Sequence, residues 1–287
     1  MAVKKTPAAT TAAKKSTSKA IVSWEADLAA QAEVAATQEA SSATGQFFSM
    51  KSGVLAWNDS PLPGNEMAVV IVDGILENVF YEGAYDPDVP QGPTCFAFGR
   101  DEKEMAPHII VSDAGQAQSL EGCASCEHNE FGSATVGKGK ACRNTRRLAM
   151  IPAGTINART GEVELFEEES HFINAAIGFM KLPVTSVKGY ASYVKQIAGT
   201  LKRPPHGVFT RVSVVPDQKT QFKVTFEAIE NCSNDIMSAV MDRHNEAKSV
   251  IDFPYQLDDG EQAPPPKRGA KKPAGKTAAA KKPTRRY

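Results

Sequence analysis

The spacing of apolar residues changes along this chain of 287 residues, and the change separates expected strands from expected helices. Segments 47–57 and 67–81 are rich in β-branched and aromatic residues, and 58–64 between them is rich in turn-forming residues. Long antiparallel strands are therefore expected here. Gly74, in the middle of the second segment, predicts a bend or bulge of the kind that curls a small sheet into a barrel.

Four further strands are expected C-terminal to residue 146. Segments 147–151 and 161–166 carry the same apolar pattern as the first two. Segments 208–215 and 221–229 are joined by a short polar turn and predict a hairpin.

Helical spacing is found at three places. Apolar residues three or four apart predict a helix over 186–197 with one buried face. Ser233 or Asn234 can cap a last helix that runs to about residue 250. An alanine-rich run at 21–40 predicts a short amphipathic helix before the folded core.

This pattern predicts a mainly β (α+β) fold. Six or more strands with few helices favour an OB-like β-barrel with a zinc-binding insert, two or three helices and disordered basic tails. We expect a tail at 1–20, a helix and linker at 21–45, a core at 46–255 and a second tail at 256–287. The insert spans 94–148 and is called the cysteine module below.

The formal net charge is zero, yet the charges are unevenly distributed. Residues 1–20 hold five lysines and residues 262–287 hold nine basic residues, both without an acid, whereas 21–261 hold 19 basic and 33 acidic residues. Tails of this Lys-Pro-Ala composition lack the apolar residues that offset the entropy of ordering, so disorder is expected. They resemble the tails of linker histones and nucleoid proteins and can bind nucleic acid, or they can fold back on the acidic core.

Four of the five cysteines fall within 48 residues, and two of them form a CxxC pair. A knuckle with two ligands and two distant cysteines can close a tetrahedral zinc site. The expected ligands of this structural Zn²⁺ are Cys95, Cys123, Cys126 and Cys142. His128 is a substitute ligand, and Cys232 is expected to be a small core residue.

The same cysteines allow alternatives to zinc. In a redox dithiol the CxxC pair is expected at the start of a helix, whereas segment 121–129 is polar and rich in turn-forming residues. Unligated thiols are a further alternative. Disulfides are disfavoured because the cysteine count is odd and no signal peptide is recognised, which favours the cytoplasm. No apolar run is long enough to cross a membrane, so no membrane partner is expected.

A zinc ion with four protein ligands has no open position for a substrate, so the metal is expected to brace a loop. Segment 137–147 holds five positive side chains and no acid, which suits contacts with a phosphate backbone. These candidate DNA contacts are Lys138, Lys140, Arg143, Arg146 and Arg147. Phe131, Trp57 and Tyr81 are candidate platforms for stacked bases. The alternatives are a solvated basic loop and aromatic residues that belong to the core.

The runs GPTCFAFG and CASCEHNEFGSATVGKGKACRNTRRLAMIP at 92–152 resemble a family of tailed-phage proteins regarded as single-stranded DNA-binding proteins. The shared features are a Cys, a CxxC pair, a Phe-Gly-Ser and the GKxKAC-x-x-x-R-R-Leu pattern. The resemblance implies zinc ligation by the four cysteines, DNA contacts by the basic residues and a role in phage DNA replication or recombination in the host cytoplasm. Such proteins usually end in an acidic tail that recruits replication proteins, whereas this chain ends in Thr-Arg-Arg-Tyr, which puts that recruitment in doubt.

The prediction is therefore non-sequence-specific binding of single-stranded DNA, with replication or recombination proteins as further partners and no catalysis. One alternative is a nucleoid-like packaging protein that binds DNA through its tails. A metal-dependent nuclease using acids and histidines such as His108, His171 and His206 is less favoured, because the chain holds no HExxH, phosphate-binding loop or nucleophile motif.

Overall fold

A computed structural model describes residues 28, 31, 46–83, 92–135 and 137–257. The predicted tail at 1–20, nearly all of the helix and linker at 21–45, and the tail from residue 258 onward lie outside the described residues. No helix in the described ranges combines the length and the apolar character needed to cross a membrane.

Within these ranges the protein is mainly β. The strands are β1 (Gln46–Lys51), β2 (Val54–Trp57), β3 (Ser60–Pro61), β4 (Glu66–Phe80), β5 (Cys95–Gly99), β6 (Arg143–Ile156), β7 (Val163–Leu165), β8 (Gly178–Leu182), β9 (Val208–Asp217) and β10 (Gln221–Asn231). The α-helices are α2 (Ile109–Asp113), α3 (Glu169–Asn174), α4 (Val184–Thr200) and α5 (Asn234–Val250). Three short 3-10 turns are η1 (Pro63–Asn65), η2 (Glu127–Asn129) and η3 (Pro205–Gly207).

The strands form one mixed sheet in the order β10-β9-β4-β6-β8-β1-β2-β3, with β5 added to β4 and β7 added to β6. Strand β1 is parallel to β8, and the other pairs are antiparallel. In the described residues no pairing joins β10 to β3 at the two ends of this order. The expected mainly β fold is confirmed as a large open sheet, whereas closure into a barrel is not shown.

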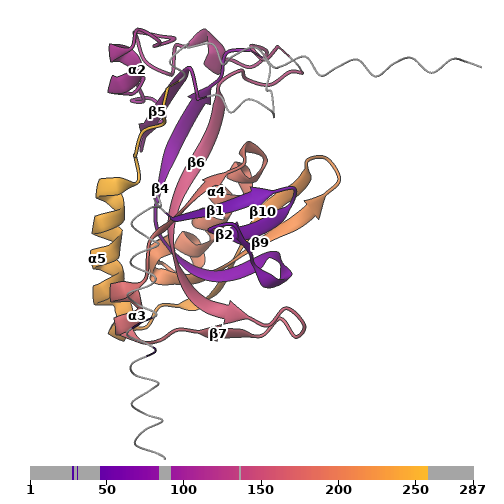
Figure 1. Cartoon of the computed structure of the whole chain (residues 1–287), viewed down its shortest axis with the longest axis vertical. Helices are drawn as coiled ribbons and strands as arrows, with labels where there is room; N and C mark the ends of the chain where they lie inside the picture. Colours follow the sequence, from indigo (N-terminus) through magenta and orange to yellow (C-terminus); the bar gives the residue numbers. More distant parts are fainter. Residues whose placement is uncertain (1–27, 29–30, 32–45, 84–91, 136, 258–287) are drawn as a thin grey trace, which may run out of the picture.

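Strands β4 and β6 extend from the body of the sheet into the cysteine module (Figure 1). On its other edge, β4 pairs with β9 over residues 66–70 and with β5 over 76–80. The β4–β6 register shifts between Ile71 and Asp73, next to Gly74. A Cβ atom on Gly74 would lie only 3.0 Å from Leu148 Cδ2 and 3.3 Å from the Tyr190 hydroxyl, so a side chain there would be crowded. The irregularity predicted at Gly74 is thus present where β4 changes its edge partner.

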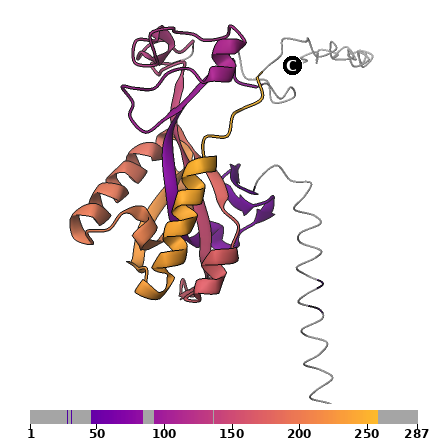
Figure 2. The ribbon, with the colours of Figure 1, turned by 90° about the vertical axis from the view of Figure 1, so that its left-hand side faces the viewer.

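The sheet is buried on both faces. Helix α4 covers one face, where Tyr193 and Ile197 pack with Val69 and Leu148. Helices α3 and α5 cover the other, where Phe172 and Ile236 pack with β-sheet residues such as Val70 (Figure 2). Burial on both faces explains why β4 is apolar at nearly every position over 67–72 instead of alternating.

Several local predictions are confirmed. Helix α4 covers the predicted 186–197, β9 and β10 form the predicted antiparallel hairpin, and α5 begins after Ser233 and ends at Val250. In the described part four α-helices are found, more than the two or three expected, because the short α2 and α3 carry no strong periodic pattern.

The prediction for 47–57 was wrong. It is not one strand but the hairpin β1–β2, which turns at Ser52 and Gly53, both with positive φ. Strand β4 does not pair with it, since its partners are β5, β6 and β9.

Candidate functional site

Two cysteines of the module lie on either side of the end of β4. Cys95 begins β5 and pairs with Phe80 of β4. Cys142 directly precedes β6, whose first residue Arg143 pairs with Val79 of β4. The connection between β5 and β6 carries the CxxC pair, and Cys123 N donates a hydrogen bond to Met105 O at 2.8 Å. The module therefore gathers cysteines from three parts of the chain around one strand end.

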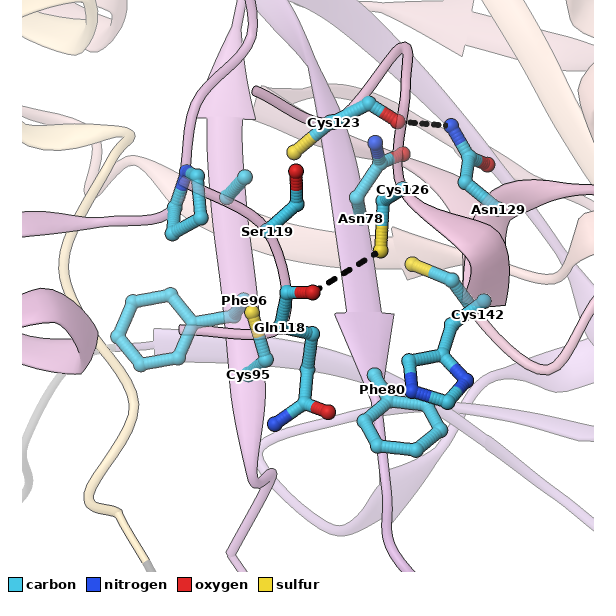
Figure 3. A pocket seen from close by; sticks show the side chains of 13 residues that line it. Asn78, Phe80, Cys95, Phe96, Gln118, Ser119, Cys123, Cys126, Asn129 and Cys142 are labelled. Carbon is cyan, nitrogen blue, oxygen red and sulfur yellow. Dashed lines mark hydrogen bonds between the residues drawn. The ribbon is translucent and has the colours of Figure 1, made fainter. Parts of the chain in front are cut away.

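All four thiols line one small cavity of about 20 Å³, room for a single small occupant. Its wall also includes Asn78 and Phe80 of β4, together with His128. Figure 3 shows the labelled side chains of Cys123, Cys126 and Cys142 around this space with Ser119 and Asn78.

The four thiols are buried and close enough to affect one another. Burial first, and then proximity to Cys123, Cys95 and Cys126, together raise the pKa of the Cys142 thiol to about 12. Burial also raises the pKa of Cys95 and of Cys123. Without a cation Cys95, Cys123 and Cys142 are held as neutral thiols, whereas a coordinated metal ion stabilises the thiolate form.

The residues fit zinc in the type and number of their donors, since four cysteines are a common structural zinc set. Within the described ranges, Asn78 Nδ2 is a buried donor without a hydrogen-bond partner, and Asn78 lies close enough to Cys123 to lower its thiol pKa. A thiolate at Cys123 would accept from this amide. Among the described residues, however, no three Cys, His, Asp or Glu side chains are gathered into a metal-binding cluster. Zinc ligation by these cysteines therefore stays a prediction.

His128, the substitute ligand, lines the same cavity but is held in another way. Its ring stacks on Phe80 with 4.2 Å between ring centroids. Its carbonyl accepts a hydrogen bond from Cys142 N at 2.7 Å. His128 thus supports the cavity wall and positions Cys142 through its backbone.

Three asparagines connect the cavity to the basic loop at 137–147. Asn144 Nδ2 donates to Asn78 Oδ1 at 2.6 Å and to Asn129 Oδ1 at 3.0 Å. Asn129 Nδ2 donates to Cys123 O at 2.8 Å, and Lys140 Nζ donates to Asn129 Oδ1 at 3.1 Å. This network was not predicted from the sequence, because asparagine in a turn-rich segment is not distinctive. The one available sign in the sequence was that Asn129 and Asn144 each lie two or three residues after a cysteine of the module.

Phe131 lies outside the cavity and is 84% exposed. Lys140 Nζ lies 5.2 Å from the centroid of its ring. The loop that carries the pair is closed by hydrogen bonds from Gly132 N to Gly139 O at 2.9 Å and from Ala141 N to Ser133 Oγ at 2.9 Å. Lys138, between them, is exposed. The structure thus places Lys140 beside an exposed aromatic ring, with Lys138 exposed on the same loop.

A second aromatic and basic pair lies at the beginning of β6. The guanidinium of the exposed Arg143 lies 5.6 Å from the centroid of the Tyr81 ring. Burial raises the pKa of the Tyr81 hydroxyl, which keeps it neutral. Two of the candidate DNA contacts, Tyr81 and Arg143, therefore lie side by side.

The prediction that Arg147 contacts DNA is wrong, because the residue is buried. Its side chain is 3% exposed, and its Nε lies 3.0 Å from Glu77 Oε2. Its Nη1 donates to Ile251 O at 3.0 Å and to Phe253 O at 2.6 Å. A guanidinium with these partners is a structural anchor and has no free face for a phosphate.

Arg146 and Trp57 do not join the basic loop either. The side chain of Arg146 lies on the face of β6 opposite to those of Arg143 and Arg147. It is partly buried and donates from Nη1 to Thr145 O at 2.9 Å. Trp57 lies on β2 in the body of the sheet, packs against the core, and has its ring centroid 4.1 Å from that of Phe48. As placed here, Trp57 is a core residue instead of a base platform.

Cys232, the fifth cysteine, is buried beneath α5, and burial raises its pKa to about 12. Its expected role as a core residue agrees with this place.

The chain matches no protein-family model, no curated protein and no solved structure. Function must therefore be argued from the geometry of the module and from the sequence motifs.

Proposed function

We propose that this protein binds single-stranded DNA without sequence specificity, through the cysteine module and Tyr81, which follows the adjoining end of β4. Phe131 and Tyr81 stack on unpaired bases, while Lys138, Lys140 and Arg143 contact phosphates. This role suits a protein of DNA replication or recombination, and the resemblance to tailed-phage proteins makes a phage origin and the host cytoplasm part of the proposal. Replication or recombination proteins are the further partners.

The exposure of Phe131 carries the proposal. A phenylalanine that is 84% exposed leaves its apolar surface in water, and no packing in the described residues accounts for it. A base that stacks on the ring brings its phosphate close to the ring. Lys140, beside the ring, supplies a positive charge for that phosphate. An aromatic face next to a cation binds any base, because every base has a π-face.

Single-stranded DNA fits this arrangement better than duplex DNA. Stacking on Phe131 and Tyr81 needs bases that are not paired within a duplex. The described candidate contacts are two small clusters on one module, without a recognition helix for the major groove. The acidic composition of residues 21–261 also requires binding to be local.

In this proposal zinc is held by Cys95, Cys123, Cys126 and Cys142, and its chemistry is structural. The ion would hold the knuckle against the end of β4, and Asn129, which hydrogen-bonds to both Cys123 O and Lys140 Nζ, links the knuckle to the basic loop. No hydrolytic step is assigned to the site, because four thiolates would leave no open coordination position. The OB-like barrel remains a prediction, since the sheet order is that of an open sheet.

The test is fluorescence anisotropy with labelled single- and double-stranded oligonucleotides of the same sequence, using the full chain and a chain of residues 21–261. The proposal predicts that residues 21–261 bind the single strand more tightly than the duplex, and that affinity falls as salt rises. Binding that disappears in residues 21–261 would favour the alternative in which the basic segments alone bind DNA.

A further inference from the structure

A row of basic and aromatic residues continues from the beginning of β6 onto the body of the sheet. The side chains of Arg143 and Arg147 lie on one face of β6, and Lys181 of β8 pairs with Arg147. Phe179 lies two residues before Lys181 on β8, and Phe47 of β1 pairs with Phe179. Because directly paired residues and residues two apart share a face, all of these side chains lie on the face that carries Arg143.

Lys181 connects this row to the candidate DNA contacts. Its Nζ lies 5.0 Å from the centroid of the Tyr255 ring and 3.0 Å from Glu77 Oε1. Burial raises the pKa of the Tyr81 hydroxyl, and the positive charges of Lys181 and Arg143 oppose that rise. Both cations are therefore close enough to Tyr81 for their charges to act on it.

The charges of this face favour an anion. Glu77 is fully buried, with Arg147 Nε at 3.0 Å and Lys181 Nζ at 3.0 Å from its carboxylate. Two positive charges against one negative leave this group with a net positive charge. Its exposed member is Lys181, whose side chain is 39% exposed. An ammonium group has three donors, and the described contacts to Glu77 and to the Tyr255 hydroxyl use two of them, so a third can reach a phosphate oxygen.

Three contacting phenylalanine rings extend the face beyond Lys181. One comes from residues 251–257, the yellow segment that rises from α5 in Figures 1 and 2, and is Phe253. The centroid of the Phe47 ring lies 6.3 Å from that of Phe179 and 5.8 Å from that of Phe253. Phe47 is 41% exposed, and the other two rings are partly exposed. Single exposed apolar residues are common, whereas a group of open rings beside a cation is typical of a binding surface.

We propose that the single strand bound by the cysteine module continues across this face, where Lys181 contacts a phosphate and Phe47 stacks on a base. This inference rests on the proposed function. Aromatic rings next to a cation suit a strand whose bases are unpaired, and the face adjoins the Tyr81–Arg143 pair. A continuous strand can therefore contact both parts.

The register of the strands gives the length of this path. Phe47 lies two strands across and six residues along from Arg143. This is about 22 Å, at about 3.3 Å per residue and about 4.8 Å per strand. At about 3.4 Å or more per nucleotide, the path holds at most about six nucleotides. An oligo(dT) of about 15 nucleotides is therefore long enough to contact the module and the face together.

Lys181→Gln tests the phosphate contact, and Lys188→Gln is its matched control. Lys188 is exposed on α4, which covers the other face of the sheet, and each variant removes one positive charge. Fluorescence anisotropy of the full chain with this oligo(dT) is measured over a range of salt concentrations. Lys181→Gln should lower the slope of log K against log salt by about 0.7, whereas Lys188→Gln should leave it unchanged. A purely structural role of Lys181 would change stability in urea without changing this slope.

Phe47→Leu tests base stacking, because it keeps an apolar side chain against Phe179 and removes the ring. Affinity for the same oligo(dT) should fall about 5-fold or more, the lower limit for one stacked base. Val184→Ala, at an exposed apolar residue of α4, should bind like the parent. Urea unfolding of each variant shows that the compared chains are folded.

Parent-like binding by either Lys181→Gln or Phe47→Leu would overturn the inference and would favour a protein partner for the face. The proposed function would stand in that case if Phe131→Ala binds oligo(dT) more weakly in the same assay. Parent-like binding by Phe131→Ala would instead overturn the proposed function, and the path from the module with it.

Discussion

Arg147 Nε lies 3.0 Å from Glu77 Oε2, and neither side chain is more than 3% exposed. The guanidinium also lies 3.9 Å from the centroid of the Phe253 ring. A residue in a strongly basic sequence segment is thus the buried link between β6, β4 and residues 251–253.

Replacing Arg147 by Gln should therefore reduce stability instead of DNA affinity. Removal of one partner from a buried ion pair typically costs about 3–5 kcal/mol, because the other charge is left unpaired. Urea unfolding of Arg147→Gln measures this loss. Arg143→Gln, at an exposed residue of the same strand, is the control: it should unfold like the parent and bind oligo(dT) more weakly. Weaker binding by folded Arg147→Gln with no loss of stability would contradict this assignment.

Zinc content should depend on the four cysteines of the module and not on Cys232. The parent chain, purified under reducing conditions with zinc present, should hold about one zinc ion per chain. Cys123→Ser should lose the metal and most of the affinity for oligo(dT), because the loop that carries Phe131 is no longer braced. Cys232→Ser should keep the metal. Metal analysis that finds no zinc in the parent would remove zinc from the account.

Asn129 should act as a positioning residue for Lys140. Asn129→Ala removes the acceptor of Lys140 Nζ and the donor to Cys123 O. Affinity for oligo(dT) should fall about 3- to 10-fold, the equivalent of about one hydrogen bond, while zinc content is unchanged. Asn174→Ala is the control, since Asn174 Nδ2 bonds only within α3, to Ser170 O. Equal affinities of the two variants would argue against the asparagine network.

Stability should fall as pH decreases because of His206. Burial lowers the pKa of His206, and the neighbouring His244 and Lys248 lower it further. The unfolded chain then binds more protons than the folded one as pH falls through about 6.5, so folding is disfavoured there. Urea unfolding at about pH 8 and about pH 5.5 should show a smaller difference for His206→Gln than for the parent. An unchanged difference would assign the pH dependence to other groups.

The sequence predicted elements whose signals are local. Helices α4 and α5 have regular apolar spacing, and β9 and β10 are two apolar runs joined by a short polar turn. The β1–β2 hairpin was missed because its short turn at Ser52 and Gly53 lies inside a segment with apolar residues on both sides, which suggested one strand. The pairing of β1 with β8 could not be predicted, since it joins segments more than 120 residues apart.

The basic segment shows a different limit. Net charge over 137–147 suggested one DNA-binding surface, yet successive residues of a strand point to opposite faces. The side chains of Arg143 and Arg147 lie on one face of β6, and that of Arg146 lies on the other. Of these three arginines, only Arg143 lies beside an aromatic candidate, Tyr81, while Lys140 lies beside Phe131. Whether a charged residue on a strand is exposed depends on the layers packed over it. The residues that cover Arg147, such as Ile251 and Phe253, are more than 100 positions away in the sequence.

The most direct test of the central claim is photocrosslinking of the full chain to oligo(dT) that contains 5-bromodeoxyuridine, followed by mass spectrometry of the linked peptides. The account predicts crosslinks at Phe131 or Tyr81, lost when zinc is removed by a chelator. Crosslinks confined to the body of the sheet or to the basic terminal segments would contradict it, because the cysteine module would then not be the surface that holds the bases.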